Sequence, residues 1–150
     1  APSWARFSYW RDPQRTAAAW AGDEFTVGDL GRVDADGFVY LDGRRGDLII
    51  TGGVNVYPLE VEKALADVDE ISDVAVFAID DAEWGQAVCA AVVSDADERC
   101  WREAATHRLA PYKRPKRWFR VDAIPTTSTG KVRRERLAED LGIVEANGNP

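Results

Sequence analysis

A short apolar run followed by two glycines and a proline constrains the fold of this chain most. These residues lie in positions 43–62, GRRGDLIITGGVNVYPLEVE. The run Leu48-Ile49-Ile50 predicts a buried strand, and Gly52-Gly53 allows a turn or the close approach of a ligand because neither residue has a Cβ. Pro58 suits the first position of a helix, where its missing N–H is not needed. Taken alone, the stretch fits either a strand–turn–helix connector or part of a ligand site.

The residues after Pro58 predict an amphipathic helix. Glu60 and Glu62 fall in its first turn, where the helix dipole favours negative charge. An apolar face repeats at helical spacing and consists of Val61, Ala64, Leu65 and Val68.

The rest of the chain alternates strand and helix patterns. Asp34–Gly37 predicts a hairpin turn, a second turn is predicted at Asp42-Gly43, and Pro111 and Pro115 predict an extended segment between them. Strands are predicted at 24–34, 38–41, 74–79, 87–93 and 118–124, and helices at 14–20, 97–109 and around 137–141. The loop 80–86 is too long for a tight hairpin. This order predicts an α+β fold, with a small mixed β-sheet flanked by helices and preceded by a β-hairpin.

The net charge of −7 hides a basic segment. Residues 108–136 contain ten Lys or Arg and two acids, so this segment carries +8 and the remainder −15. An acidic body with one basic segment indicates a local anion site or a solvated basic face, and argues against general nucleic-acid binding. No apolar run is long enough to cross a membrane, and no N-terminal signal is present, which predicts a cytoplasmic protein.

Few residues offer chemistry by themselves. We expect His107 to be a surface residue, and Cys89 and Cys100 to be reduced structural thiols. The sequence contains no motif for a metal cluster or a phosphate loop. Asp29 could accept hydrogen bonds from ribose hydroxyls or cap a turn. Arg44 could bind a phosphate, and Lys131 follows Gly130 on a polar loop that we expect to be mobile, where an ammonium could meet developing charge.

Five short motifs occur in a fixed order. They are Gly28-Asp29-Leu30-Gly31-Arg32, Gly43-Arg44, Gly52-Gly53-Val54-Asn55-Val56-Tyr57-Pro58-x-Glu60-Val61-Glu62, Tyr112-Lys113-x-Pro115 and Pro125-x-x-x-x-Gly130-Lys131. Together they resemble the C-terminal end of the adenylate-forming superfamily, which includes acyl- and aryl-CoA synthetases, peptide-synthetase adenylation domains and beetle luciferases. The form of the glycine loop resembles the CoA-ligase branch.

The resemblance implies a two-step reaction with ATP and CoA as co-substrates. A carboxylate attacks the α-phosphate of ATP, giving an acyl-AMP and pyrophosphate, and the CoA thiol then displaces AMP. Between the steps the C-terminal domain rotates and presents a different face to the same pocket.

The resemblance also implies roles for individual residues. Lys131 resembles the lysine that bridges the carboxylate and the α-phosphate, and Asp29 and Arg44 resemble ligands of the nucleotide. The loop that lines the pantetheine tunnel is matched by Gly52, Gly53, Val54 and Asn55. Contacts to the CoA nucleotide in aryl-CoA ligases are matched by Tyr112, Arg114 and Lys116.

The resemblance divides the chain into four parts. Residues 1–43 would end a large N-terminal domain, 44–46 would form a hinge, 47–142 a lid domain, and 143–150 a disordered tail. Gly46 stands where the family usually has Asp or Lys; glycine can absorb the φ/ψ change of a hinge, but a charge contact is lost. The rest of the large domain, with the ATP loop, the Mg²⁺ ligand and the acid pocket, is the expected partner.

Three functions follow as hypotheses. The first is the C-terminal domain of an ATP-dependent acyl- or aryl-CoA ligase, inactive by itself because the ATP cradle is missing. The absence of Met from the sequence favours an excised domain. The second is a stand-alone, non-catalytic module that binds CoA or a protein partner. The third is a fragment of an amino-acid-activating adenylation domain.

Overall fold

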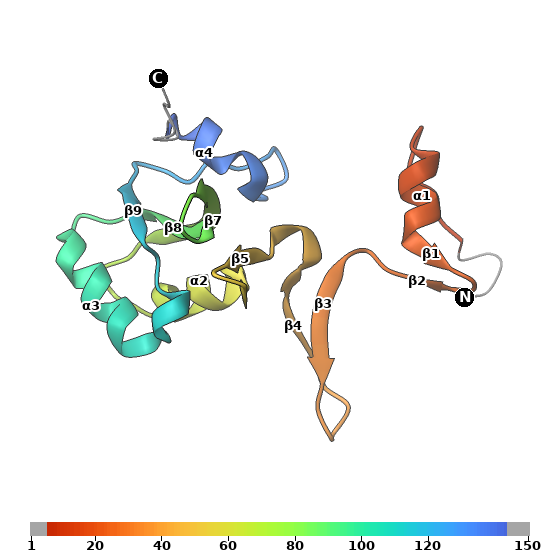
Figure 1. The fold of residues 1–150 in the computed structure, drawn as a ribbon, viewed down its shortest axis with the longest axis horizontal. Helices are drawn as coiled ribbons and strands as arrows, with labels where there is room; N and C mark the ends of the chain where they lie inside the picture. The colour runs from red at the N-terminus through yellow and green to blue at the C-terminus, as the bar shows by residue number, and fades with distance from the viewer. Residues whose placement is uncertain (1–5, 144–150) are drawn as a thin grey trace. The chain divides into compact units, whose positions relative to one another are not determined.

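The computed structural model describes residues 6–143 as two compact units, one ending at Gly46 and the other beginning at Asp47 (Figure 1). The tail predicted at 143–150 lies outside the described residues, except for Ile143, which packs partly against the core of the second unit. No helix among residues 6–143 is long and apolar enough to cross a membrane.

The first unit holds one helix and two small antiparallel sheets. Helix α1 (Pro13–Ala19) begins at Asp12, whose carboxylate accepts the N–H of Arg15 at 2.9 Å, a typical helix cap. Strands β1 (Trp20–Ala21) and β2 (Glu24–Phe25) form one sheet, and β3 (Asp29–Val33) and β4 (Val39–Arg44) form the other.

The predicted turn between β3 and β4 is confirmed. The Asp34 carboxylate accepts the N–H groups of Asp36 and Phe38 and the hydroxyl of Tyr40. The Phe38 N–H contributes most to lowering the pKa of Asp34 below its ordinary value. The second predicted turn, at Asp42-Gly43, is wrong: both residues lie within β4, and Asp42 forms a bulge because Gly43 pairs with Leu30 and Leu41 with Gly31.

The second unit contains the predicted mixed sheet, which has five strands. Its strands are β5 (Ile49–Thr51), β6 (Val54–Val56), β7 (Asp73–Asp81), β8 (Gly85–Val93) and β9 (Arg117–Arg120). The order is β6-β5-β8-β7, all antiparallel, and β9 runs parallel to β8 beyond the end of β5. The helices are α2 (Pro58–Ala66), α3 (Glu98–Arg108) and α4 (Leu137–Asp140). Short 3₁₀ turns are η2 (Arg45–Asp47), η3 (Pro111–Lys113) and η4 (Arg134–Arg136).

The sheet separates two apolar cores, because alternate residues of its central strands point to opposite faces. On one face, Val76 and Val88 pack with Leu65 of α2 and Trp101 of α3. On the other, the core consists of Ala75, Phe77, Ile79, Ala87, Cys89, Ala91, Ile124 and Leu137. Figure 1 shows the same arrangement, with β7 and β8 between α2 and α3 on one side and α4 on the other.

Three local predictions were wrong. The loop between β7 and β8 is only three residues long, because the Asp81 carboxylate accepts the N–H groups of Glu83 and Trp84 and closes a tight turn. The segment that begins at Pro111 is the 3₁₀ turn η3, which runs to Lys113, and not the extended segment predicted there. Strand β9 ends at Arg120, where its side chain turns to donate to main-chain carbonyls outside the ladder.

Both cysteines are free, as predicted. Burial raises the pKa of the Cys89 thiol to about 11, so this thiol stays protonated and unreactive near neutral pH. His107 is exposed at the last turn of α3, as predicted for a surface residue.

Candidate functional site

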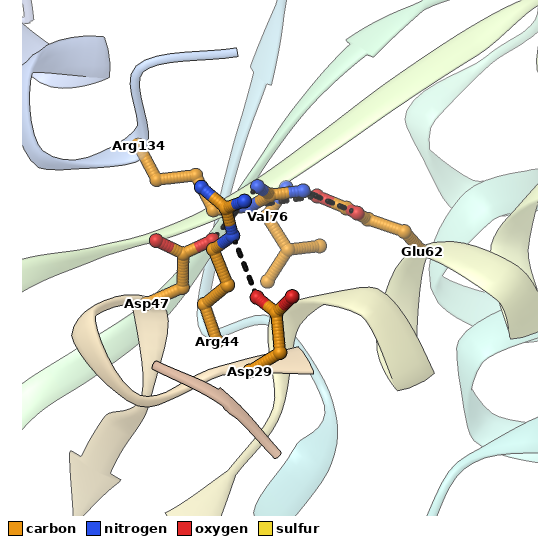
Figure 2. A network of polar contacts seen from close by, with 6 residues as sticks. All are labelled: Asp29, Arg44, Asp47, Glu62, Val76 and Arg134. Atoms are coloured by element: carbon orange, nitrogen blue, oxygen red, sulfur yellow. Dashed lines mark hydrogen bonds and ion pairs between the residues drawn. The ribbon is translucent and has the colours of Figure 1, made fainter. Parts of the chain in front are cut away.

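The two predicted nucleotide ligands are direct partners across the β3–β4 hairpin. The register pairs Asp29 with Arg44, and the Arg44 Nε donates to the Asp29 carboxylate at 2.9 Å (Figure 2). Their side chains are 34% and 55% exposed, so the pair adds little stability and both groups remain accessible to a ligand. Gly31 of the same motif is required by the fold, because a Cβ there would lie 2.3 Å from the Tyr40 carbonyl oxygen.

The predicted glycine loop is the two-residue turn between β5 and β6. Thr51 pairs with Val54, and Gly52 and Gly53 have φ of +56° and +78°, the left-handed pair that a tight hairpin turn requires. The two glycines differ in their surroundings. A Cβ on Gly52 would lie 2.9 Å from Cε3 of Trp84, whereas one on Gly53 would meet nothing within 4 Å.

Trp84 joins the glycine turn to one of the predicted CoA contacts. Its carbonyl oxygen accepts the Gly52 N–H at 2.8 Å, and the Lys116 Nζ lies 3.5 Å from the centre of its ring. Asp81 fixes the loop that carries Trp84, and Arg117 donates to the same carboxylate at 3.1 Å. The Trp84 N–H contributes most to lowering the pKa of Asp81. Sequence reasoning missed Trp84; a large aromatic in a short acidic loop was the available signal.

The other residues predicted to contact CoA are placed differently from one another. Val54, Asn55 and Tyr112 are exposed, and η3, which carries Tyr112, lies against β6. Arg114 instead donates to the carbonyl oxygens of Thr106 and Leu109 at the end of α3. In this arrangement the Arg114 guanidinium caps a helix end.

Lys131 is presented by a small hydrogen-bonded hairpin. Thr126 and Val132 form a bridge, and Thr127 exchanges hydrogen bonds with Lys131: its N–H donates to the Lys131 carbonyl at 2.8 Å and its hydroxyl accepts the Lys131 N–H at 3.2 Å. Gly130 completes the turn at φ +77°. The backbone is therefore fastened by its own hydrogen bonds, which differs from the mobile arm predicted for this loop, while the lysine side chain is exposed.

The contacts of the basic segment single out Lys131. Six of its ten cations pair with carboxylates, and these are Arg108, Lys113, Arg117, Arg133, Arg134 and Arg136. Arg114 and Arg120 donate to carbonyl oxygens, and Lys116 lies over the Trp84 ring. Among residues 6–143, none offers the ammonium group of Lys131 a hydrogen bond, ion pair or ring contact. Most of the +8 charge thus serves the fold, and Lys131 is available for an external anion.

A charged network that sequence reasoning missed lies three residues after Lys131. Arg134 donates to both carboxylate oxygens of Glu62, at 2.9 and 2.7 Å, and to Asp47 at 3.1 Å (Figure 2). Glu62 was assigned to the helix dipole, but it is buried and also accepts the N–H of Val76 at 2.8 Å. The spacing of 72 positions between Arg134 and Glu62 left no local sequence signal.

No group of three or more metal-ligating side chains is found among residues 6–143.

Known proteins resemble this chain in both sequence and fold. The family described as "AMP-binding enzyme C-terminal domain" matches residues 60–131. The chain belongs to this family. The match begins within helix α2 and takes in the central strands, α3 and the loop that ends at Lys131. Of the predicted site it includes Tyr112, Arg114, Lys116 and Lys131.

The relatives are CoA ligases. The chain is 39% identical over 134 residues to long-chain-fatty-acid–CoA ligase FadD13 of Mycobacterium tuberculosis. The alignment covers 87% of this chain and 27% of the relative. It is 41% identical over 133 residues to 2-succinylbenzoate–CoA ligase of Geobacillus kaustophilus, covering 86% and 27%. The chain thus spans about a quarter of the length of these relatives.

A solved structure shows the same fold. The o-succinylbenzoate CoA synthetase MenE of Bacillus subtilis, in complex with its acyl-adenylate intermediate, superposes with a TM-score of 0.81 at 33% identity. The match covers 87% of this chain and 27% of that one. The predicted α+β class and the predicted membership of the adenylate-forming superfamily are both confirmed.

Proposed function

We propose that this domain serves an ATP-dependent acid–thiol ligase that makes acyl- or aryl-CoA. The single observation that carries the proposal is the exposed ammonium of Lys131, which has no partner among residues 6–143 and is presented by a hydrogen-bonded hairpin. The relatives that match this chain are named as CoA ligases, which supports the same activity.

In the first step a carboxylate oxygen of the acid attacks the α-phosphorus of ATP. The P–O bond to pyrophosphate breaks and an acyl-AMP forms. Negative charge from two anions meets at the α-phosphate, and a lysine ammonium placed between them offsets that charge. We assign this role to Lys131. Asp29 would accept hydrogen bonds from the ribose hydroxyls, and Arg44 would lie near the ribose and phosphate.

In the second step the sulfur of CoA attacks the acyl carbonyl carbon and AMP leaves. The glycine turn suits the approach of a thin pantetheine arm, because even a Cβ on Gly53 would meet nothing within 4 Å and Val54 and Asn55 are exposed beside it. Tyr112, Lys116 and Arg114 would contact the CoA nucleotide, although Arg114 would have to release its carbonyl partners to do so.

We propose that the second unit rotates about Gly46 between the two steps. Three observations support the rotation. The boundary between the two compact units falls directly after Gly46, and a Cβ there would meet nothing within 4 Å. The strands that carry the glycine turn bury Ile49 and Val56 in one core, whereas Val132, next to Lys131, packs against the other. One orientation would therefore suit each step.

A large N-terminal domain is the proposed partner, and it would supply the rest of the ATP site, the acid pocket and the ligands of any Mg²⁺. The test is ATP- and CoA-dependent thioester formation by the enzyme that contains both parts, assayed against a panel of fatty and aromatic acids. We expect AMP, pyrophosphate and acyl-CoA in equal amounts. The 150-residue chain alone should give no ATP–pyrophosphate exchange, and clear exchange by that chain would contradict the proposal.

A further inference from the structure

The segment that presents Lys131 is fastened to the rest of the second unit by Arg134. This guanidinium uses three of its nitrogens: Nε and Nη2 donate to Glu62, and Nη1 donates to Asp47 (Figure 2). The Arg134 side chain is 20% exposed and that of Glu62 is 11% exposed. A forked, largely desolvated arginine–carboxylate pair holds its partners in one geometry, because two parallel hydrogen bonds must form together.

Glu62 ties this arginine to the sheet. Strand β7 lies at an edge of the sheet formed by the described strands, and a Glu62 oxygen accepts the N–H of Val76 there at 2.8 Å. The same oxygen accepts from Arg134 at 2.9 Å. The carboxylate thus connects helix α2, the edge of the sheet and η4 in a single contact set.

Asp47 connects the network to the proposed hinge. It is the first residue of the second unit and follows Gly46 directly. Its carboxylate is 32% exposed and accepts from Arg134 at 3.1 Å. Arg134 therefore connects the residue next to Gly46 with the segment that begins three residues earlier at Lys131.

We propose that Arg134 is a positioning residue for the adenylation step. Because Arg134 fastens the Lys131 segment to both Glu62 and Asp47, Lys131 and the rest of the second unit move as one rigid body when the unit rotates at Gly46. Arg134 touches no substrate in this account and acts through Lys131. The proposal rests on the proposed ligase function and adds a residue to it.

The test compares half-reactions in the enzyme that contains both parts. Acyl-AMP formation and thioester formation from supplied acyl-AMP are measured separately for R134Q, R134K, D47A and, as a matched control, R136Q. Arg136 lies in the same 3₁₀ turn, but among residues 6–143 its side chain pairs only with the exposed Glu139. Misplacing a catalytic group by about 1 Å can cost about 100-fold, so we expect R134Q to slow adenylation about 10- to 100-fold and to leave the thioester step within about twofold.

The smaller variants keep the proposal testable if R134Q does not fold. R134K can still pair with Glu62 but cannot span Glu62 and Asp47 together, so we expect it to fold and to remain slow in adenylation. D47A removes one hydrogen bond from Arg134 and leaves those to Glu62 in place, so we expect it to slow the same step alone and by less than R134Q does. R136Q should match the wild type in both steps.

Hydrogen exchange of the same proteins supplies a second readout. R134Q and D47A should speed exchange at the amides of Gly130 and Lys131 and leave the central strands β7 and β8 protected, and R136Q should change neither. Equal slowing of both half-reactions, or unchanged adenylation in folded R134Q and D47A, would overturn the positioning role. Absence of ligase activity in the wild type, by contrast, would overturn the proposed function itself.

Discussion

The Lys131 hairpin and the glycine turn are both short loops at the rim of one domain, yet they are built in opposite ways. The Lys131 hairpin fixes its backbone through Thr127 and leaves a charged group without a partner among the described residues. The glycine turn carries no charge, and its Gly52 lies directly against the Trp84 ring. One loop therefore offers a positioned charge, and the other offers a shape.

This difference matches the chemistry proposed for each loop. Adenylation brings two anions together, so a preorganised cation lowers the barrier most. Thioester formation needs a long, thin arm to reach the acyl carbonyl, so the absence of side chains matters more than charge. We therefore expect variants of the two loops to differ in which step or property they change.

The largest effect is expected for K131A. Losing a preorganised charge of this kind costs about 3–4 kcal/mol, or roughly 100- to 1,000-fold in rate. Pyrophosphate release in the enzyme that contains both parts should fall by that amount. Because the Lys131 side chain has no partner among residues 6–143, the unfolding free energy of the domain should stay unchanged. A large loss of stability would show that the lysine belongs to the fold.

The next effect compares two alanine variants of the glycine turn. G53A carries only the cost of a left-handed alanine, about 1–2 kcal/mol. G52A carries that cost and also a contact with Trp84, for a total of about 2–4 kcal/mol. Urea unfolding of the two variants measures the difference directly. Equal stabilities would mean that Trp84 does not shape the turn.

A pH effect is expected from Asp81, which holds the Trp84 loop. Its pKa lies below the ordinary value of 3.8 in the folded state, so the folded protein binds fewer protons than the unfolded chain. The stabilisation is therefore present above that value and is lost as the pH falls through the lower, folded-state pKa. Acid unfolding of wild type and D81N should show a smaller dependence on pH for D81N, and identical slopes would contradict this role.

The smallest effect is expected for K116Q. It removes the cation from the Trp84 ring, a contact worth about 0.5–1 kcal/mol at an exposed site. K63Q is the matched control, because Lys63 is an exposed lysine on α2. In urea unfolding, the free energies of unfolding of the two variants should differ by that amount. Equal values would mean that the contact of Lys116 with the Trp84 ring does not stabilise the domain.

The sequence predicted the regular parts of this fold well. The apolar runs at 74–79 and 87–93 lie inside β7 and β8, and Pro58 is the first residue of α2. These features depend on local periodicity and on the fixed φ of proline, so they can be read from neighbouring residues. The ordered motifs likewise predicted the family that the comparison confirms.

The failures come from contacts between distant residues. Asp42-Gly43 has the composition of a turn, but pairing with Leu30 keeps Gly43 in a strand. The loop before Gly85 looked long because the hydrogen bonds that Asp81 accepts cannot be seen in the sequence. The basic segment looked like one anion site, but most of its arginines pair with acids, several of them far away in the chain. The roles of the site residues themselves remain predictions.

The most direct test of the account is a reciprocal pair of rates in the enzyme that contains both parts. K131A and G53L are each assayed for acyl-AMP formation and for thioester formation from supplied acyl-AMP, with folding checked by thermal unfolding. A leucine at position 53 would project into open space from the turn and into the proposed pantetheine path. We predict that K131A slows only the first step and G53L only the second. Equal slowing of both steps in both variants would contradict a division of labour between charge and shape.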